Sequence, residues 1–333
     1  MRAAVCGAYG PPEVVTVQTL PSVPLEAGQI RIRIESAAVN FSDVLLIANK
    51  YQVSVPPPFT PGSEFAGVVS EIADGVTTVA VGGGVTTVSV GDRVTGTGFV
   101  GAFAEEIVIA SDKLTLGRIP DGVETRIAAA FGVAHRTAYH TLRSVARIKS
   151  GDELIVLGAG GGVGLAAVQL GVALGASVTA VASSTKKLDV AASYGAGHLV
   201  NHRTEDLRTA LKKALPQGAD VVADPVGGDL SEPALRALRP GGRFVTIGYA
   251  SGVIPKIPLN LILVKGVQVN GFQFKDIPPE EYRRNEAELT DLLVAGRTVP
   301  HIGAEFPLDK AADALRMVAD GQAVGKVLID LTS

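Results

Sequence analysis

The feature that most constrains the fold is a regular alternation of apolar strands and helices in the second half of the chain. The predicted strands are residues 153–158, 177–182, 219–224 and 243–248, and the predicted helices between them are residues 163–174, 186–194 and 232–238. Repeated strand–helix–strand units at this spacing require a parallel sheet with helices on its faces. We therefore expect a doubly wound α/β region.

A different pattern precedes and follows this region. Residues 29–35 alternate apolar and charged side chains with period two, which is typical of a half-buried strand in a β-rich part. Near the C-terminus, residues 280–295 are predicted to be helical, and Asp309 is expected to cap a further helix with Leu308, Ala311, Leu315 and Val318 on one face. The final strand, residues 326–330, has no partner nearby in sequence. We expect it to join the N-terminal β-rich part.

A tandem duplication of nine residues interrupts the β-rich part. Residues 75–83 read Gly-Val-Thr-Thr-Val-Ala-Val-Gly-Gly, and residues 84–92 read Gly-Val-Thr-Thr-Val-Ser-Val-Gly-Asp. Two copies are too few for a solenoid, which needs at least three stacked repeats. The second copy is therefore interpreted as a lengthened surface hairpin or loop, where insertions are tolerated.

Composition excludes several classes of protein. With 47% hydrophobic and 19% charged residues, the chain can bury a sizeable core, which rules out intrinsic disorder. A net charge of −3 without runs of like charge indicates neither a nucleic-acid partner nor a membrane-surface partner. The single Cys6 excludes an internal disulfide and a thiolate zinc cluster. Without a signal-peptide or membrane-spanning apolar run, a cytoplasmic protein is expected.

The first strand–helix junction carries a glycine-rich turn at residues 158–164. A strict G-x-G-x-x-G would need glycine at Ala159, so the match is A-x-G-x-x-G. Between a strand and a helix, glycines let the backbone approach a pyrophosphate, and the helix N-terminus offers amide donors. No Gly-Lys-Ser/Thr follows, which excludes a Walker phosphate loop. The turn predicts a dinucleotide site at Gly161, Gly162, Val163 and Gly164.

The end of the second strand, about 20 residues further on, indicates which dinucleotide binds. An NAD site would carry an acid there, whereas residues 182–187 read Ala-Ser-Ser-Thr-Lys-Lys and contain none. Hydroxyls and a lysine suit a 2′-phosphate, which an acid would repel. The same residues can also cap the next helix, and the two roles are compatible. NADP(H) is favoured over NAD(H), with Ser183, Ser184 and Lys187 as phosphate ligands.

Taken together, these motifs resemble the zinc-free NADPH:quinone oxidoreductase branch of the medium-chain dehydrogenase/reductase superfamily, over nearly the whole chain. The matching segments are residues 39–43, 50–53, 58–67, 91–94, 158–164, 224–228, 241–243 and 325–326. The resemblance implies a Rossmann-type doubly wound parallel sheet plus a GroES-like β-rich catalytic domain. The expected domains are residues 1–130 (catalytic), 131–271 (dinucleotide-binding) and 272–333 (return to the catalytic domain). It also implies a homodimer through the nucleotide-binding domain, with residues 266–271 as a candidate edge strand.

The zinc-free branch is also indicated by the absence of the zinc ligands that other members of the superfamily carry. Zinc-containing relatives carry a Cys three residues before the position of Asp43 and a His between the glycine and glutamate at 62 and 64. Asn40 and Ser63 stand there, and neither is a usual zinc ligand. The histidine pairs 135/140 and 198/202 lack a neighbouring carboxylate or cysteine pattern. We interpret these histidines as solvated or locally bonded and expect no metal.

The resemblance also implies site residues. Asn40 would lie near the nicotinamide ribose and ring, and Asp43 would order its loop. Tyr51 would either donate a hydrogen bond to the oxygen that gains charge or pack under the loop at residues 56–58; the two alternatives stay open. His202 stands where the family often has tyrosine, near the adenine, with Arg203 beside it. The remaining implied cofactor contacts are Thr137, Val226, Gly248, Tyr249, Phe272, Phe274 and Lys326, although the two phenylalanines can equally pack between domains.

In this family, hydride passes from the nicotinamide C4 to a quinone or to the β-carbon of an activated alkene. The conjugated carbonyl accepts the electron pair, so no metal is needed. We therefore expect a zinc-independent, NADPH-dependent reductase of a small quinone or α,β-unsaturated carbonyl. An enoyl-thioester reductase of the acrylyl- or enoyl-CoA type is the alternative on the same scaffold. An NADPH-binding protein with little catalysis is the alternative from another class.

Overall fold

The computed structural model describes residues 1–74, 76, 78–81, 84–110 and 115–332. Its internal contacts divide the chain into two compact units: unit 1 is Met1–Val133 with Pro300–Ser333, and unit 2 is Ala134–Val299. Helix α2 (Thr125–His140) begins in unit 1 and ends in unit 2. Residues 272–299 group with unit 2 by contacts, whereas the sequence interpretation returned the chain to the catalytic domain at residue 272. As a division into folding domains, the boundaries 1–130, 131–271 and 272–333 remain a prediction.

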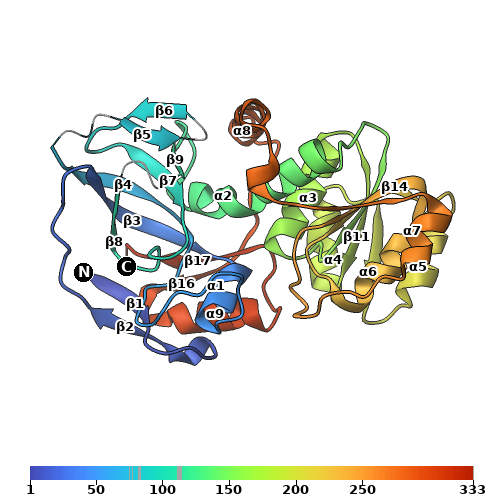
Figure 1. Cartoon of the computed structure of the whole chain (residues 1–333), viewed down its shortest axis with the longest axis horizontal. Helices are drawn as coiled ribbons and strands as arrows, with labels where there is room; N and C mark the ends of the chain where they lie inside the picture. Colours follow the sequence, from blue (N-terminus) through green and yellow to red (C-terminus); the bar gives the residue numbers. More distant parts are fainter. Residues whose placement is uncertain (75, 77, 82–83, 111–114, 333) are drawn as a thin grey trace. The chain divides into compact units, whose positions relative to one another are not determined.

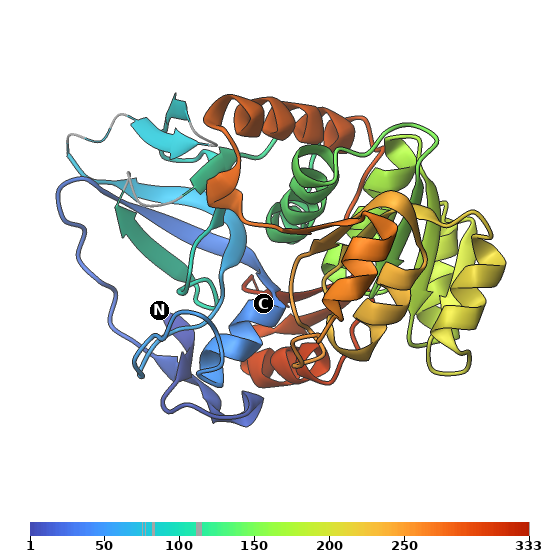
Figure 2. The same cartoon turned by 45° about the vertical axis from the view of Figure 1, so that its right-hand side comes forward.

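Unit 2 contains a six-stranded parallel sheet in the order β12-β11-β10-β13-β14-β15. Helices α3 and α4 lie on one face, and α5, α6 and α7 lie on the other (Figure 1). Figure 2 shows α5 to α7, yellow to orange, in front of the sheet. This is the expected doubly wound arrangement. The strands are β10 (Glu153–Leu157), β11 (Ser177–Ala182), β12 (His198–Asn201), β13 (Ala219–Asp224), β14 (Leu238–Thr246) and β15 (Gln268–Gly271).

The helices of unit 2 are α3 (Gly162–Ala173), α4 (Thr185–Ser193), α5 (Leu207–Ala214), α6 (Ser231–Arg236), α7 (Leu259–Lys265) and α8 (Pro279–Val294). The helices predicted at residues 163–174, 186–194 and 280–295 are present within one residue of their expected bounds, whereas α5 and α7 lie where no helix was predicted. The prediction was wrong at the junction of α6 and β14, because the helix stops at Arg236 and the strand starts at Leu238. Leu238 already pairs with Ala219 of β13, and a register shift separates this pair from the main ladder. Pairing with a neighbouring strand therefore extends β14 beyond its apolar run.

Unit 1 is built on a seven-stranded sheet in the order β16-β17-β3-β4-β7-β9, with β8 also paired to β3. The C-terminal strand β17 is antiparallel to β3 and parallel to β16, so it joins the N-terminal part as expected. The strands of this sheet are β3 (Gln29–Val39), β4 (Glu64–Ile72), β7 (Arg93–Thr97), β8 (Glu106–Ala110), β9 (Thr115–Arg118), β16 (Ile302–Pro307) and β17 (Lys326–Asp330). Strands β1 (Arg2–Cys6) and β2 (Val15–Thr19) form a separate antiparallel pair. Two helices, α1 (Phe41–Ile47) and α9 (Ala311–Ala319), belong to the same unit.

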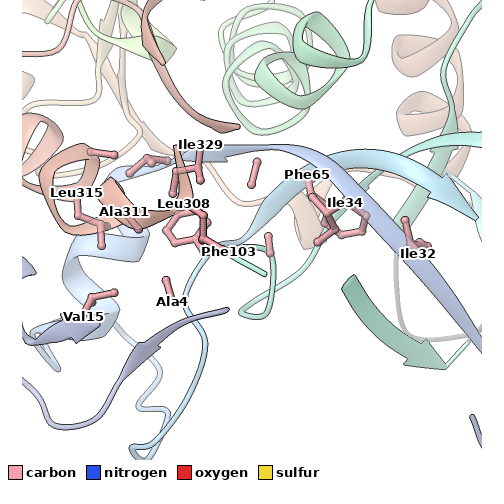
Figure 3. Packing of buried hydrophobic residues seen from close by; sticks show 14 of the residues in the cluster. Ala4, Val15, Ile32, Ile34, Phe65, Phe103, Leu308, Ala311, Leu315 and Ile329 are labelled. Carbon is pink, nitrogen blue, oxygen red and sulfur yellow. The ribbon is translucent and has the colours of Figure 1, made fainter. Parts of the chain in front are cut away.

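The core of unit 1 joins residues from both ends of the chain (Figure 3). Leu308, Ala311 and Leu315 are buried against strand residues such as Ile329, which confirms the predicted apolar face. The predicted cap was wrong: residues 308–310 form a 3-10 turn, and Lys310, not Asp309, precedes α9 without a side-chain cap. The Asp309 carboxylate pairs instead with Arg2. This ion pair brings together residues from opposite ends of the sequence, which no local signal predicts.

The duplicated segment forms a small antiparallel sheet of its own. Strand β5 (Thr78–Val81) comes from the first copy and β6 (Gly84–Thr87) from the second, with Thr78 opposite Thr87. The two copies therefore pair with each other as antiparallel strands, in agreement with the hairpin interpretation. Residues 75, 77, 82 and 83 of the repeat lie outside the described residues. Of the helices that the structure describes, none combines the length and apolarity needed to cross a membrane.

Candidate functional site

The glycine turn of unit 2 connects β10 to α3 through a tight backbone crossing. The Gly161 N–H donates to the Gly158 carbonyl oxygen at 2.9 Å, and α3 begins at the next residue. A Cβ on Gly164 would lie only 2.0 Å from that same oxygen, so no larger residue fits there. Ala159 is fully buried and does not have a positive φ, so it needs no glycine. The A-x-G-x-x-G variant therefore keeps the close crossing of strand and helix for which the glycines of the strict motif are used.

The residues predicted to hold a 2′-phosphate lie beside this turn. Ser184 is the N-cap of α4, and its Oγ accepts a hydrogen bond from the Lys187 N–H at 3.4 Å, so the capping role is confirmed. The aliphatic part of Lys187 crosses directly over Gly160, where a Cβ would lie 2.5 Å from the lysine Cβ and Cγ. Burial lowers the pKa of the Lys187 ammonium. The lysine is thus held between the glycine turn and the end of β11.

His202 joins the same edge of the sheet from β12. Its N–H donates to the carbonyl oxygen of Ala182, the last residue of β11, at 3.1 Å. Burial lowers the pKa of the His202 imidazole, and the nearby charges of Arg203 and Lys187 lower it further. Ser183, His202 and Lys187 therefore gather at the carboxyl ends of two adjacent parallel strands, where ligands of such sheets bind.

Asp224, at the end of β13, shapes the next loop along this edge. Its Oδ1 accepts hydrogen bonds from the Val226 and Gly227 N–H groups, both at 2.8 Å, and its Oδ2 accepts one from the Ser231 hydroxyl. This places Val226 against Gly158, whose Cβ would lie 2.6 Å from the valine Cγ2. The loop after β14 lies against the Asp224 loop. The Gly248 N–H points to the Asp224 carbonyl oxygen at 3.4 Å, and the Tyr249 ring lies beside Gly227. The sequence interpretation quoted Asp224 but assigned it no role.

Phe272 and Phe274 belong to a separate aromatic cluster. Their rings meet edge to face at 4.8 Å, and Phe274 also meets the ring of His140, which stacks on Tyr282 of α8. The expectation of solvated or locally bonded histidines was wrong for His140. The ring is fully buried, and its Nδ1 lies 3.1 Å from the Asn285 Nδ2, 145 residues along the chain. Thr137, one turn before His140 on α2, is buried as well.

Unit 1 brings two predicted site residues into direct contact. The Lys326 Nζ donates to the Asn40 Oδ1 at 2.6 Å and to the Glu64 Oε2 at 2.9 Å. Asn40 is 8% exposed, Lys326 is 4% exposed and Glu64 is fully buried. The other Glu64 oxygen accepts the Val133 N–H at 2.6 Å. The sequence interpretation missed Glu64 because its partners are distant in sequence, although a charged residue opening an apolar strand was a usable signal.

Asp43 completes this buried polar cluster. Its Oδ2 accepts the Asn40 N–H at 2.8 Å, which orders the start of α1 as expected. Burial raises the pKa of the Asp43 carboxyl to about 7, against the opposing effects of the Asn40 N–H, the Ser63 hydroxyl and the Lys326 charge. The carboxyl group is therefore poised between its neutral and charged forms at neutral pH.

Tyr51 lies apart from the buried cluster, in the bend after α1, and is 36% exposed. The following loop is tied down by a different tyrosine: the Tyr9 hydroxyl lies 2.9 Å from the Ser54 Oγ and donates to the Val55 carbonyl at 3.0 Å.

Comparisons with known proteins agree with this architecture. A family model described as "Alcohol dehydrogenase GroES-like domain" matches residues 26–121, and one described as "Zinc-binding dehydrogenase" matches residues 162–291. The mouse "Quinone oxidoreductase-like protein 2" is 35% identical over 335 residues, which cover 99% of this chain and 92% of that protein. The chain belongs to the quinone oxidoreductase branch of the medium-chain dehydrogenase/reductase superfamily.

Two further proteins are similar to this chain over most or all of their length. The human "Synaptic vesicle membrane protein VAT-1 homolog" is 31% identical over 350 residues, covering 99% of this chain and 86% of that protein. The crystal structure of Escherichia coli quinone oxidoreductase complexed with NADPH matches with a TM-score of 0.88 and 27% identity, covering 99% of this chain and 100% of that one. The superfamily match confirms the Rossmann-type sheet and the GroES-like domain.

The description of one family model raises the question of zinc, and the donor set does not fit that metal. Asn40 and Ser63 offer an amide and a hydroxyl, which are poor zinc ligands. The Lys326 ammonium already binds the Asn40 and Glu64 oxygens. Within the described part of the chain, no group of three or more His, Cys, Asp or Glu residues could hold a metal ion.

Proposed function

We propose that this quinone oxidoreductase relative is a zinc-independent, NADPH-dependent reductase of small quinones or α,β-unsaturated carbonyls. The observation that carries the proposal is the carboxyl end of β11, where Ser183 and Ser184 lead into α4 and Lys187 crosses over the glycine turn. Hydroxyls and an ammonium at this position suit a 2′-phosphate. The E. coli relative, solved with NADPH, supports the same cofactor.

The proposed cofactor site extends along the sheet edge of unit 2. The backbone of Gly161, Gly162, Val163 and Gly164 would hold the pyrophosphate, because the N–H groups at the start of a helix and the positive end of its dipole attract anions. Ser183, Ser184 and Lys187 would hold the 2′-phosphate, and His202 would lie near the adenine. The proposed contacts on the nicotinamide side are Asn40, Thr137, Val226, Gly248, Tyr249, Phe272, Phe274 and Lys326.

NADPH supplies a hydride when bound, and a conjugated carbonyl accepts the electron pair without a Lewis acid. The task left to the chain is to orient the two reactants and to stabilise the oxygen that gains charge. The Tyr51 hydroxyl is the proposed donor to that oxygen. Zinc independence is supported by the chemistry of Asn40 and Ser63 and by the charge of Lys326, which repels a metal cation.

The proposal includes a cytoplasmic homodimer joined through unit 2. In its support, β15 is an edge strand of the six-stranded sheet, and Leu259, Leu263 and Val264 of α7 are largely exposed. Sedimentation of the wild type and of Leu263→Asp tests the dimer: a dimeric wild type and a monomeric variant are expected. A monomeric wild type would contradict the proposal. Cell fractionation tests the location.

Oxidation of NADPH and of NADH by metal-free protein tests the activity. The acceptors are phenanthrenequinone, a simple enone and an enoyl thioester, each in a separate assay. Turnover of the quinone or the enone with NADPH preferred is expected. Turnover restricted to the thioester would indicate an enoyl-thioester reductase, and NADPH binding without turnover would indicate a binding protein. Activity that requires added zinc would contradict zinc independence.

A further inference from the structure

Lys326 is an ammonium group held almost completely inside unit 1. It opens β17, and its N–H donates to the His301 carbonyl oxygen at 2.8 Å. Gly325, with φ +70°, makes this possible, because a Cβ there would lie 2.1 Å from the same oxygen. The backbone therefore directs Lys326 to one place, where its Nζ reaches Asn40 and Glu64. Burying an ammonium is unfavourable unless it is paired in this way.

The ion pair also determines the orientation of the Asn40 carboxamide. Its Oδ1 faces an ammonium, which can only donate, and its Nδ2 lies 3.1 Å from the Glu64 carboxylate, which can only accept. The longer contacts of Nδ2, at 3.4 Å, go to the Ser63 hydroxyl and the Ala38 carbonyl. If the amide were rotated by half a turn, its NH₂ group would face the Lys326 ammonium and its oxygen would face the Glu64 carboxylate. Donor would then meet donor, and acceptor would meet acceptor. Lys326 and Glu64 thus leave one orientation.

We propose that Lys326 is a positioning residue that, with Glu64, fixes Asn40 as an acceptor toward bound ligand. The amide hydrogens of Asn40 are directed to acceptors within unit 1, whereas Oδ1 can only accept and lies beside the Lys326 ammonium and the start of α1. Asn40 therefore binds a hydroxyl group, such as a ribose hydroxyl of the cofactor, and does not donate to the carbonyl that is reduced. This inference rests on the proposed NADPH-dependent function.

Two variants that differ only at residue 326 carry the test. Glu64→Gln keeps an oxygen for the Lys326 ammonium, which still has the Asn40 Oδ1 as acceptor and the Asp43 carboxyl nearby. Lys326→Met in the same background removes the hydrogen bond to Asn40 together with the remaining charge. Neutral groups of similar length commonly replace a buried ion pair without unfolding the protein. Arg243→Met is the matched control, because it removes another partly buried ion pair, to Asp152, within unit 2.

The first readout is hydrogen exchange of the side-chain amide of Asn40 in cofactor-free protein labelled with ¹⁵N-asparagine. The buried Asn285 of unit 2 serves as an internal reference. The Asn40 signal should exchange slowly in the wild type and in Glu64→Gln, and at least roughly tenfold faster in Lys326→Met/Glu64→Gln, because the fixed geometry is lost. Equal protection of Asn40 in both variants would overturn the positioning role.

The second readout is steady-state kinetics. Lys326→Met/Glu64→Gln should lower kcat by roughly ten- to a hundredfold relative to Glu64→Gln while changing the NADPH dissociation constant much less, because a misplaced ribose impairs orientation more than affinity. Arg243→Met should lower the unfolding temperature without lowering kcat selectively relative to the NADPH dissociation constant. Equal kcat values in Glu64→Gln and Lys326→Met/Glu64→Gln would show that Lys326 only neutralises the charge of Glu64, and this result would overturn the inference. A wild type inactive with every acceptor would contradict the proposed function alone, since amide exchange would still test Lys326.

Discussion

The Glu64 carboxylate reaches helix α2 and accepts the backbone N–H of Val133, with its Oε1 2.6 Å from the nitrogen. Gly132 makes room for it, because a Cβ there would lie 2.9 Å from that oxygen and 3.2 Å from the Thr97 methyl. Glycine inside a helix costs about 1 kcal/mol relative to alanine. The close approach of a buried carboxylate explains why glycine is used here.

Gly132→Ala tests this relationship directly. Helix propensity alone predicts a gain of about 1 kcal/mol in the free energy of unfolding. Glu64 cannot move aside without loosening Lys326 and Val133, so we expect a net loss of about 1–3 kcal/mol. Thermal and urea unfolding measure the difference. A variant more stable than the wild type would show that the Glu64 carboxylate can move away from Val133 and Lys326 at little cost.

Two glycines of the nucleotide turn should respond differently to alanine. Gly164→Ala forces a Cβ to within 2.0 Å of the Gly158 carbonyl oxygen, so we expect a large loss of stability together with the loss of NADPH binding. Gly161→Ala meets only the same oxygen at 3.6 Å, so we expect a stability change within about 1 kcal/mol. NADPH affinity should nevertheless fall, because the pyrophosphate is proposed to approach this residue. Urea unfolding and NADPH fluorescence separate the two effects, and equal destabilisation would contradict the prediction.

Asp43 should make stability depend on pH. Its folded-state pKa of about 7 lies above the ordinary value of 3.8, so the folded protein binds more protons than the unfolded chain between those values. The free energy of unfolding therefore decreases as the pH rises from about 4 to about 7, and the full cost of the charged carboxylate applies above that range.

Asp43→Asn removes this titration and keeps an oxygen that can accept the Asn40 N–H. The variant should gain stability relative to the wild type as the pH rises through that window, by a few kcal/mol at most. Urea unfolding at several pH values measures the difference between the two proteins, in which all other titrations cancel. If the free energies of unfolding of the two proteins changed in parallel with pH, Asp43 would not titrate between about pH 4 and 7.

Lys187 should distinguish NADPH from NADH. Loss of one charge-assisted hydrogen bond to a phosphate costs roughly 1.5–3 kcal/mol, or about ten- to a hundredfold in affinity. Lys187→Met should weaken NADPH binding by that factor and leave NADH binding nearly unchanged. The neighbouring Lys186 is exposed, so Lys186→Met is the matched control and should affect neither. Equal weakening of both nucleotides would place Lys187 away from the 2′-phosphate.

Much of unit 2 could be predicted because its signals are local. Strand β11 and strand β13 have the expected bounds, and the glycine turn lies between β10 and α3. Errors occurred where a distant partner decides the outcome. Strand β14 begins early because Leu238 pairs with Ala219, and α9 begins late because residues 308–310 form a 3-10 turn at the core of unit 1.

The sequence by itself determined the doubly wound sheet and the glycine turn, because hydrophobic period and turn chemistry act over a few neighbouring residues. Only the tertiary structure decided the partners of Asn40, since 286 positions separate it from Lys326 and 24 separate it from Glu64. A buried ion pair leaves no periodic trace in a sequence. Its members are identified only when the strands and helices that carry them pack together. Once both charges are buried, removing one leaves the other unpaired, which is strongly destabilising.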